Sequence, residues 1–241
     1  KRWRTMLGMP LCATPHWYPV LRSRELHRKP LARKRFGINM VFWRSASGRA
    51  IALRDRCPHR GAALSLGKVD AAGISCPFHG FCFAADGHFV RPPPEGDRPI
   101  PPDLRAESYI TTEQDGYVWL WRGDPLVERP APPMHEVLQG LNYGESVSIW
   151  DAHYTRCIEN VCDFSHLPFV HRTTIGLFRK ERQTDVEIDP LDDGMRAWLM
   201  DKGQRSQSFE FIYPNLWLLN VDRSLLLTAV FVTITDKQTE V

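Results

Sequence analysis

The sequence lacks a long apolar run, a strong excess of charge and a nucleotide-binding fingerprint. Its longest apolar run, residues 225–234, is interrupted by threonine and falls short of the roughly 20 residues that cross a bilayer, so we expect no membrane span. The 31 basic and 28 acidic residues give a net charge of +3, so the composition does not indicate a nucleic-acid partner. Neither G-x-G-x-x-G nor a P-loop occurs, so nicotinamide or flavin chemistry would belong to a separate protein.

The cysteines do not form the pattern of a disulfide framework. There are six in 241 residues, and Cys12, Cys82, Cys157 and Cys162 are scattered along the chain. This usage is typical of a reducing compartment, and we expect the protein to be cytoplasmic. No secretory signal is visible. The chain nevertheless begins at Lys1 and stops just after a strand-like run, so we expect both ends to be truncated, which leaves room for a lost targeting segment.

The other two cysteines lie in the most informative segment, where each is followed closely by a histidine. One loop offers Cys57 and His59, and the second offers Cys76 and His79. A zinc finger usually groups cysteine with cysteine and histidine with histidine. One Cys and one His in each loop better suits a centre that gives one metal two sulfurs and its neighbour two nitrogens, which is the Rieske [2Fe–2S] cluster. Zinc and a metal-free structural loop are the alternatives.

A second group of candidate metal ligands lies between residues 159 and 171. Asp163 and His166 are three residues apart and would share a helix face, and Pro168 should end or bend that helix before His171. Such a bend turns His171 back toward His166. Two neutral imidazoles with open positions for a carboxylate, oxygen and substrate are typical of non-haem Fe(II) oxygenases. A pair of helix-end histidines with no metal is the alternative.

The pattern of short strands and turns predicts an α+β chain with two domains. Residues 15–123 read as all-β, with strands at 17–20, 34–43 and 50–54 and hairpins around Asp86-Gly87 and Asp115-Gly116. Prolines between 125 and 133 mark a linker. Residues 124–241 combine a helical stretch, around 134–170, with antiparallel strands that we predict at 186–188, 195–200, 208–213, 216–221 and 225–235. In these strands Trp198, Trp217, Leu219 and Phe231 are expected to be core residues.

Taken together, these motifs resemble those of a known family. Cys57-Pro58-His59-Arg60-Gly61-Ala62 and Cys76-Pro77-Phe78-His79-Gly80-Phe81, followed by Asp163-x2-His166-x4-His171, resemble the Rieske non-haem iron oxygenases. Phe169-Val170-His171 favours their monooxygenase and demethylase branch. Phe81 departs from the Trp of many members. The resemblance implies an all-β Rieske [2Fe–2S] domain over 15–123 and a helix-grip catalytic domain over 124–241 that lacks its C-terminal part.

The resemblance also assigns a role to each candidate residue. It implies that Cys57 and Cys76 bind one cluster iron, that His59 and His79 bind the other, and that His166 and His171 bind a mononuclear Fe(II). It implies that Asp163 bridges a cluster histidine of one subunit to an iron histidine of the next, and hence a homotrimer. The family's third iron ligand is a carboxylate on a C-terminal helix, which we expect beyond Val241.

The implied activity is that of the terminal oxygenase (alpha) component of a multicomponent system. It would take electrons from a separate ferredoxin or flavin reductase that uses NAD(P)H, activate O2, and hydroxylate or O/N-demethylate a small apolar or aromatic substrate. The alternative is a Rieske ferredoxin-type electron carrier with a C-terminal ligand-binding domain. A carrier needs only residues up to about 123, so the motif at 159–171 favours the oxygenase. Basic residues beside the first loop offer either a docking site for an acidic ferredoxin or merely a solvated rim (Arg54, Arg56, Arg60 and Lys68).

Overall fold

The computed structural model of the chain describes residues 15–91, 104–133, 144–173, 185–220 and 226–241. Contacts divide the chain into two compact units. The first runs to Pro132 and includes residues 234–236, and the second comprises the remaining residues from Pro133 onward. This division falls inside the proline-rich segment. That residues 15–123 and 124–241 form two independently folding domains remains a prediction.

Antiparallel sheets make up the first unit. One sheet has the order β1-β11-β10 (His16–Arg22, Tyr117–Arg122 and Thr111–Gln114), and a second has the order β2-β3-β4-β9 (Leu31–Arg35, Ile38–Arg44, Ala50–Arg54 and Ser108–Tyr109). A third, made of two- and three-residue strands, has the order β5-β6-β7-β8 (Lys68–Val69, Ile74–Ser75, Cys82–Phe83 and Phe89–Arg91). Two short 3-10 helices, η2 (Ser23–Glu25) and η3 (Leu64–Leu66), complete the unit.

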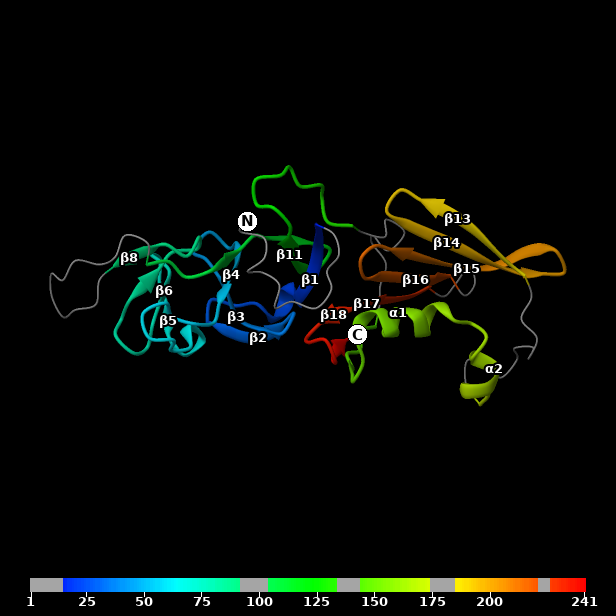
Figure 1. The fold of residues 1–241 in the computed structure, drawn as a ribbon, viewed down its shortest axis with the longest axis horizontal. Helices are drawn as coiled ribbons and strands as arrows, with labels where there is room; N and C mark the ends of the chain where they lie inside the picture. Colours follow the sequence, from blue (N-terminus) through cyan, green and yellow to red (C-terminus); the bar gives the residue numbers. More distant parts are fainter. Residues whose placement is uncertain (1–14, 92–103, 134–143, 174–184, 221–225) are drawn as a thin grey trace. The chain divides into compact units, whose positions relative to one another are not determined.

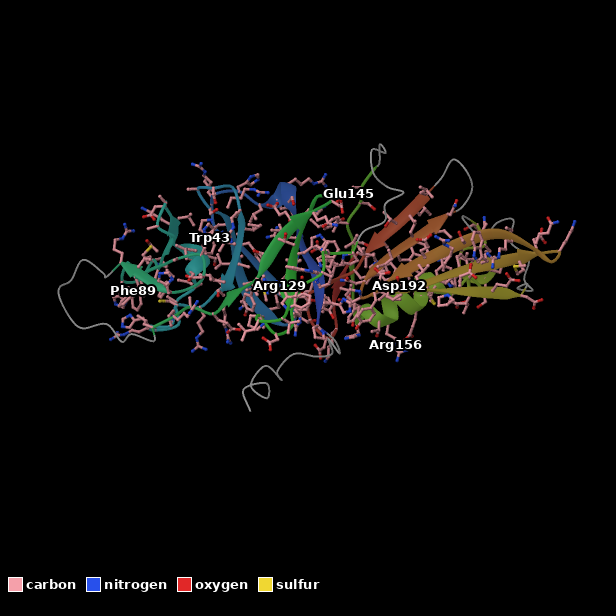
Figure 2. The ribbon with its side chains drawn as sticks, turned by 90° about the horizontal axis from the view of Figure 1, so that it is seen from above. Trp43, Phe89, Arg129, Glu145, Arg156 and Asp192 are labelled. Atoms are coloured by element: carbon pink, nitrogen blue, oxygen red, sulfur yellow. The ribbon has the colours of Figure 1, made fainter. Side chains whose placement is uncertain are left out.

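Two apolar clusters fill the interior of this unit. Tyr18, Phe36 and Phe42 are buried in the first cluster, and Trp43, Leu53 and Phe83 in the second. Trp43 of β3 lies among the strands (Figure 2). The second cluster also contains Cys57 and Cys76. The two candidate cysteine ligands are therefore part of the core.

Both predicted hairpins are present. β10 and β11 pair across Asp115-Gly116, where both residues have positive φ angles, and β7 pairs with β8 around Gly87. The single strand predicted at 34–43 is wrong. Phe36 and Gly37 both have positive φ and form a tight turn between β2 and β3. The Phe36 ring packs edge-on against the ring of Tyr18, with 5.6 Å between the ring centroids.

A five-stranded antiparallel sheet dominates the second unit. Its order is β13-β14-β15-β16-β17 (Val186–Leu191, Gly194–Asp201, Gln204–Ile212, Leu216–Asn220 and Leu226–Val230). A small sheet has the order β12-β19-β18 (Ile149–Trp150, Thr239–Glu240 and Val232–Thr233). Figure 1 shows the helix α1 (Tyr154–Cys162) alongside the large sheet, and the one-turn helix α2 (Leu167–Val170) follows it.

The helical stretch predicted around 134–170 is helical only over α1 and α2 in the part that the structure describes, and is wrong for residues 144–153. Residues 144–153 are not helical and include β12, and α1 begins only at Tyr154, where His153 accepts a hydrogen bond from the Thr155 amide. From there, apolar side chains at Tyr154, Cys157, Ile158 and Val161 form one stripe. This stripe packs on the sheet.

The two faces of the large sheet differ in chemistry. One face packs Ala197, Phe209 and Trp217 against α1. The other face carries polar groups, among them an ion pair between Arg196 and Glu210. Because side chains alternate along a strand, this division follows from the sequence pattern. The described helices include none long and apolar enough to cross a membrane. The mostly antiparallel sheets, with few helices, confirm the predicted fold class.

Candidate metal centres

The two Cys-His loops have the same backbone geometry. In the first, the Cys57 amide donates to Ala62 O at 2.7 Å and the Gly61 amide donates to Cys57 O at 2.8 Å. In the second, the Cys76 amide donates to Phe81 O at 2.8 Å and the Gly80 amide donates to Cys76 O at 3.0 Å. Gly61 and Gly80 have φ angles of +77° and +76°, which a residue with a Cβ rarely adopts. Each loop is therefore closed in the same way around its cysteine.

The two cysteines meet at the base of the loops. Cys57 and Cys76 are 2% and 3% exposed, and the thiols contact each other. Burial first, and the contact with Cys76 second, raise the pKa of Cys57 to about 11, even though the backbone N–H groups of His59 and Arg60 point at the sulfur and act to lower it. A thiol held neutral in this way ionises when a metal replaces its proton. Amides aimed at the sulfur then stabilise the charge.

The two histidines of the loops lie outside the cysteines. Their ring centroids are 4.9 Å apart, with His59 exposed and His79 half-buried. The Nδ1 atom of His79 is buried and has no hydrogen-bond partner among the described residues. Partial desolvation first, and then the charges of His79 and Arg60, lower the pKa of His59. A lowered pKa favours the neutral imidazole that binds metal.

The arrangement fits a two-iron cluster better than the zinc alternative. Sulfur lies against sulfur in the core and imidazole lies against imidazole near the surface, so each metal would find two like donors. Within the described residues, no group of three or more His, Cys, Asp or Glu side chains is placed to hold one ion. A closed tetrahedral zinc site would require four such donors around one ion.

Phe81 and Asp55 support the loops, but only Phe81 belongs to the sequence motif. The ring centroids of Phe81 and His59 lie 4.6 Å apart. Where many members of the family have tryptophan, this chain therefore places a phenyl group against a candidate ligand. Asp55 accepts hydrogen bonds from the amide and the hydroxyl of Ser65, at 2.7 and 2.6 Å. This links the end of β4 to η3 and fixes the approach to the first loop. An aspartate before a cysteine carried no recognisable signal for that role.

The second candidate centre lies where α1 ends and α2 begins. The prediction that Pro168 ends the helix is wrong, because α1 already stops at Cys162 and Pro168 lies in the first turn of α2. Proline is favoured there because a backbone N–H in the first turn of a helix has no partner within the helix, so no hydrogen bond is lost. The break occurs at Asp163, whose carboxylate accepts hydrogen bonds from the amide and hydroxyl of Ser165. Such a local bond competes with the helix.

This turn brings the two predicted iron ligands together. His166 precedes α2 and His171 follows it, and their ring centroids lie 5.3 Å apart. The Nδ1 atom of His166 is buried without a hydrogen-bond partner among the described residues, 3.6 Å from the nearer carboxylate oxygen of Asp163. A buried imidazole with an unused nitrogen fits a metal ligand. The donor types suit Fe(II).

Asp163 lies beside this pair at the surface. Its side chain is 49% exposed, and the hydrogen bond from Ser165, with a smaller contribution from His166, holds its pKa below the ordinary value. It is therefore ionised at neutral pH. The expected third carboxylate ligand is not found with His166 and His171 among the described residues, and its place beyond Val241 remains a prediction.

Comparisons with known proteins divide the chain at the same two motifs. Residues 16–105 match the Rieske [2Fe-2S] domain, and residues 150–215 match the vanillate O-demethylase oxygenase C-terminal domain. Aminopyrrolnitrin oxygenase PrnD of Pseudomonas fluorescens is 34% identical over 76% of this chain and 50% of its own length. The oxygenase component of dicamba O-demethylase from Stenotrophomonas maltophilia is 32% identical over 73% of this chain and 54% of its own.

A third relative and two solved structures are also similar to this chain. The vanillate O-demethylase oxygenase subunit of Pseudomonas sp. (strain HR199 / DSM 7063) is 33% identical over 66% of this chain and 45% of its own. The chain thus spans about half the length of the curated relatives it matches. The crystal structure of dicamba monooxygenase bound to dicamba aligns with 93% of this chain and 74% of its own at a TM-score of 0.74, with 23% identity. A mutant of NdmA from Pseudomonas putida CBB5 with caffeine aligns with 93% of this chain and 71% of its own at a TM-score of 0.80, with 25% identity.

The domain matches confirm the resemblance that the motifs suggested. The first match covers both Cys-His loops, and the second covers Asp163, His166 and His171. The chain therefore belongs to the Rieske oxygenases, of which it carries the Rieske [2Fe–2S] domain and a vanillate O-demethylase-type catalytic region.

Proposed function

We propose that this chain is part of the terminal oxygenase of a multicomponent system that hydroxylates or demethylates a small aromatic substrate. The observation that carries this proposal is the presence of both candidate centres on one chain, the paired loops with Cys57 and Cys76 and the turn with His166 and His171. A pure electron carrier would need only the loops. The names of the relatives, two of which are O-demethylases, support the same reading.

Each side chain has a distinct task in this proposal. Cys57 and Cys76 would hold one cluster iron in the core, while His59 and His79 would hold the other near the surface, where a redox partner has access. His166 and His171 would hold the mononuclear iron, their orientation fixed by α2 between them. When bound, the [2Fe–2S] cluster supplies one-electron transfer and the mononuclear Fe(II) supplies O2 activation.

Asp163 is proposed to orient an iron histidine and to link subunits. One carboxylate oxygen faces His166 at 3.6 Å, the other accepts the hydrogen bonds of Ser165, and the side chain is half-exposed, so a group of another molecule can reach it. A carboxylate beside a ligating imidazole fixes the ring and raises its basicity. We propose that the Asp163 carboxylate also accepts a hydrogen bond from a cluster histidine of a neighbouring copy in a homotrimer. The electron donor would be a separate ferredoxin or NAD(P)H-dependent flavin reductase, and the location cytoplasmic.

Metal analysis combined with turnover tests this proposal. Protein that extends past Val241 to the expected third ligand, isolated with its metals, should contain iron and acid-labile sulfide in a ratio of about three to two, and should show a Rieske-type electron paramagnetic resonance signal after reduction. Supplied with a reductase, ferredoxin, NADH and a methoxybenzoate, it should release formaldehyde. An iron-to-sulfide ratio of one, with reversible cluster reduction and no oxygen uptake, would favour the electron carrier.

A further inference from the structure

Phe81 closes the second Cys-His loop and contacts the candidate histidine ligand of the first. Its ring centroid lies 4.6 Å from that of His59, with 39° between the two planes. Its carbonyl oxygen accepts the Cys76 amide that closes its own loop. In the first loop Ala62 accepts the Cys57 amide in the same way, but alanine carries no ring. The two loops therefore share a backbone geometry and differ in this side chain.

The Phe81 ring is supported from behind by the core. It packs against Phe89 of β8, labelled in Figure 2, with 5.8 Å between the ring centroids, and Phe89 packs against Phe83 at 6.4 Å. Phe83 is fully buried in the second apolar cluster of this unit, and Phe81 packs against the same cluster. Because close packing leaves a ring few orientations, Phe81 offers the imidazole a rigid support.

The two candidate histidines have different aromatic neighbours. His79 is half-buried, and the ring of Phe78, its neighbour in the sequence, lies 4.1 Å from it. Phe78 is 59% exposed. His59 is exposed, and the ring against it comes from the opposite loop and is partly buried. Phe81 therefore both covers one side of His59 and ties the first loop to the second.

An apolar ring beside a ligand changes the energy of cluster reduction. A cluster of two Fe(III), two sulfides, two thiolates and two neutral imidazoles has no net charge, and one added electron makes it negative. Water stabilises that charge, and an apolar neighbour does not. The apolar shell of a metal site therefore influences its reduction potential through solvent access and local dielectric. A phenyl ring against a ligand is expected to lower the potential.

We propose that Phe81 is a positioning residue of the iron–sulfur cluster, which fixes the ring plane of His59, keeps water from one side of it and thereby lowers the reduction potential. This inference rests on the proposed function, since it takes His59 as a cluster ligand. The phenyl ring has no atom that could bind iron, so it acts only through the histidine. A lower potential makes the reduced cluster a stronger electron donor.

Redox titration of the chain isolated with its cluster tests this, with the Rieske electron paramagnetic resonance signal as the readout. Phe81→Ala opens one side of His59 to water. We expect the equilibrium constant for one-electron reduction to rise about three- to tenfold, a positive shift of roughly 30–60 mV, because tenfold corresponds to about 59 mV. Phe81→Leu keeps an apolar side chain at this position and should stay within about twofold of the wild type.

The line shape of the same signal reports the orientation of the ligand rings. A ring held in one plane gives narrow lines, and a ring that is free to tilt spreads them. Leucine and alanine both lack a flat surface, so we expect broader lines from both variants. Phe81→Leu thus separates the two effects, with broader lines at an unchanged potential. It also decides the matter if Phe81→Ala fails to assemble the cluster, since lines as narrow as those of the wild type would exclude the positioning role.

Phe89→Leu is the matched control, because it changes the packing behind Phe81 and leaves Phe81 against His59. It should lower the thermal unfolding midpoint, as the loss of a packed ring does, and leave the potential unchanged. An unchanged potential in Phe81→Ala would show that the ring does not shield the cluster, and the proposal would be wrong. A shift in Phe89→Leu as large as that in Phe81→Ala would also overturn it, since loosening of the core would then be the cause.

The measurements keep this inference apart from the proposed function. The potential and the line shape are recorded without substrate, ferredoxin or O2, and oxygen uptake is measured separately with the reductase added. The expected shift without oxygen uptake would support the role of Phe81 and contradict the oxygenase. Oxygen uptake with no shift would support the oxygenase and exclude Phe81 as a determinant of the potential. A wild-type protein without a Rieske signal would overturn both.

Discussion

The imidazole rings of His59 and His79 lie 4.9 Å apart, above two cysteines that touch each other in the core. The loops that carry them repeat the same pair of backbone hydrogen bonds, so the four donors are held before any metal arrives. Because the thiols are buried and the rings are near the surface, the two ends of the centre differ in solvent access. This asymmetry makes the roles of the cysteines and histidines separable by mutation.

Cys76→Ser should abolish the cluster and, with it, any activity. Serine offers a harder and far less acidic donor than the thiolate that an iron–sulfur cluster requires. The measurement is the visible absorption spectrum of the purified protein together with its sulfide content. Cys82→Ser is the matched control, because Cys82 is equally buried but lies in β7 outside the loop. A Cys76→Ser variant with an intact cluster spectrum would exclude Cys76 as a ligand.

His171→Ala should deplete the mononuclear iron selectively. Removal of one of the two described imidazole donors should lower iron affinity more than about tenfold, while the cluster, held in the other unit, keeps its iron and sulfide. Metal analysis after dialysis against a chelator gives the result, with His88→Ala as the control at an exposed histidine. Unchanged iron content in His171→Ala would mean that other side chains hold the metal.

The sequence predicted the hairpins because their turns depend on local residues. At Asp115-Gly116 both residues have the positive φ of a tight turn, and at Asp86-Gly87 the glycine supplies it. The strand predicted at 34–43 was wrong because the turn at Phe36 depends on packing against Tyr18, which is remote in the sequence. Likewise, α1 ends at Cys162 because Asp163 bonds to Ser165, and the stronger signal of Pro168 concealed this.

The candidate ligands were predictable because metals require particular donors at close spacing. Cys57, His59, Cys76 and His79 lie together as the loops implied, and His166 lies beside His171. Their metal-binding roles stay predictions. That the Trp217 indole N–H finds no partner among the described residues was not predictable, because every strand tryptophan has the same donor and only the tertiary arrangement decides which one is satisfied.

Glu113→Gln should destabilise the first unit in a pH-dependent manner. Arg44 donates two hydrogen bonds to the Glu113 carboxylate, at 2.7 and 2.8 Å, and these lower its pKa below the ordinary 4.5. Because the native pKa is lowered, the stabilisation is fully present above about pH 4.5 and is lost as the pH falls through the native value. At pH 7 we expect the variant to lose about 1 kcal/mol of unfolding free energy.

Urea denaturation at several pH values checks this expectation. The difference between wild type and Glu113→Gln should be constant between pH 5 and 7 and should shrink below about pH 4.5. Glu107→Gln is the control, since Glu107 and Arg54 form a more exposed ion pair at 3.0 Å, which contributes little. A difference that persists unchanged at low pH would mean that packing, and not the charge of Glu113, is responsible.

Asp163→Asn should leave both centres loaded and slow the electron transfer between them. Asparagine retains an oxygen that can accept the Ser165 amide, so the turn that places His166 after α1 should persist, while the negative charge beside His166 is lost. Without that charge, the imidazole is less basic and a neighbouring cluster histidine loses its charged acceptor. We expect wild-type iron and sulfide contents, and cluster oxidation in a single turnover slowed at least about tenfold.

Ser165→Ala, which removes only the hydroxyl bond to Asp163, should oxidise its cluster at nearly the wild-type rate. Rapid oxidation of the cluster in Asp163→Asn would show that the carboxylate is not part of the route.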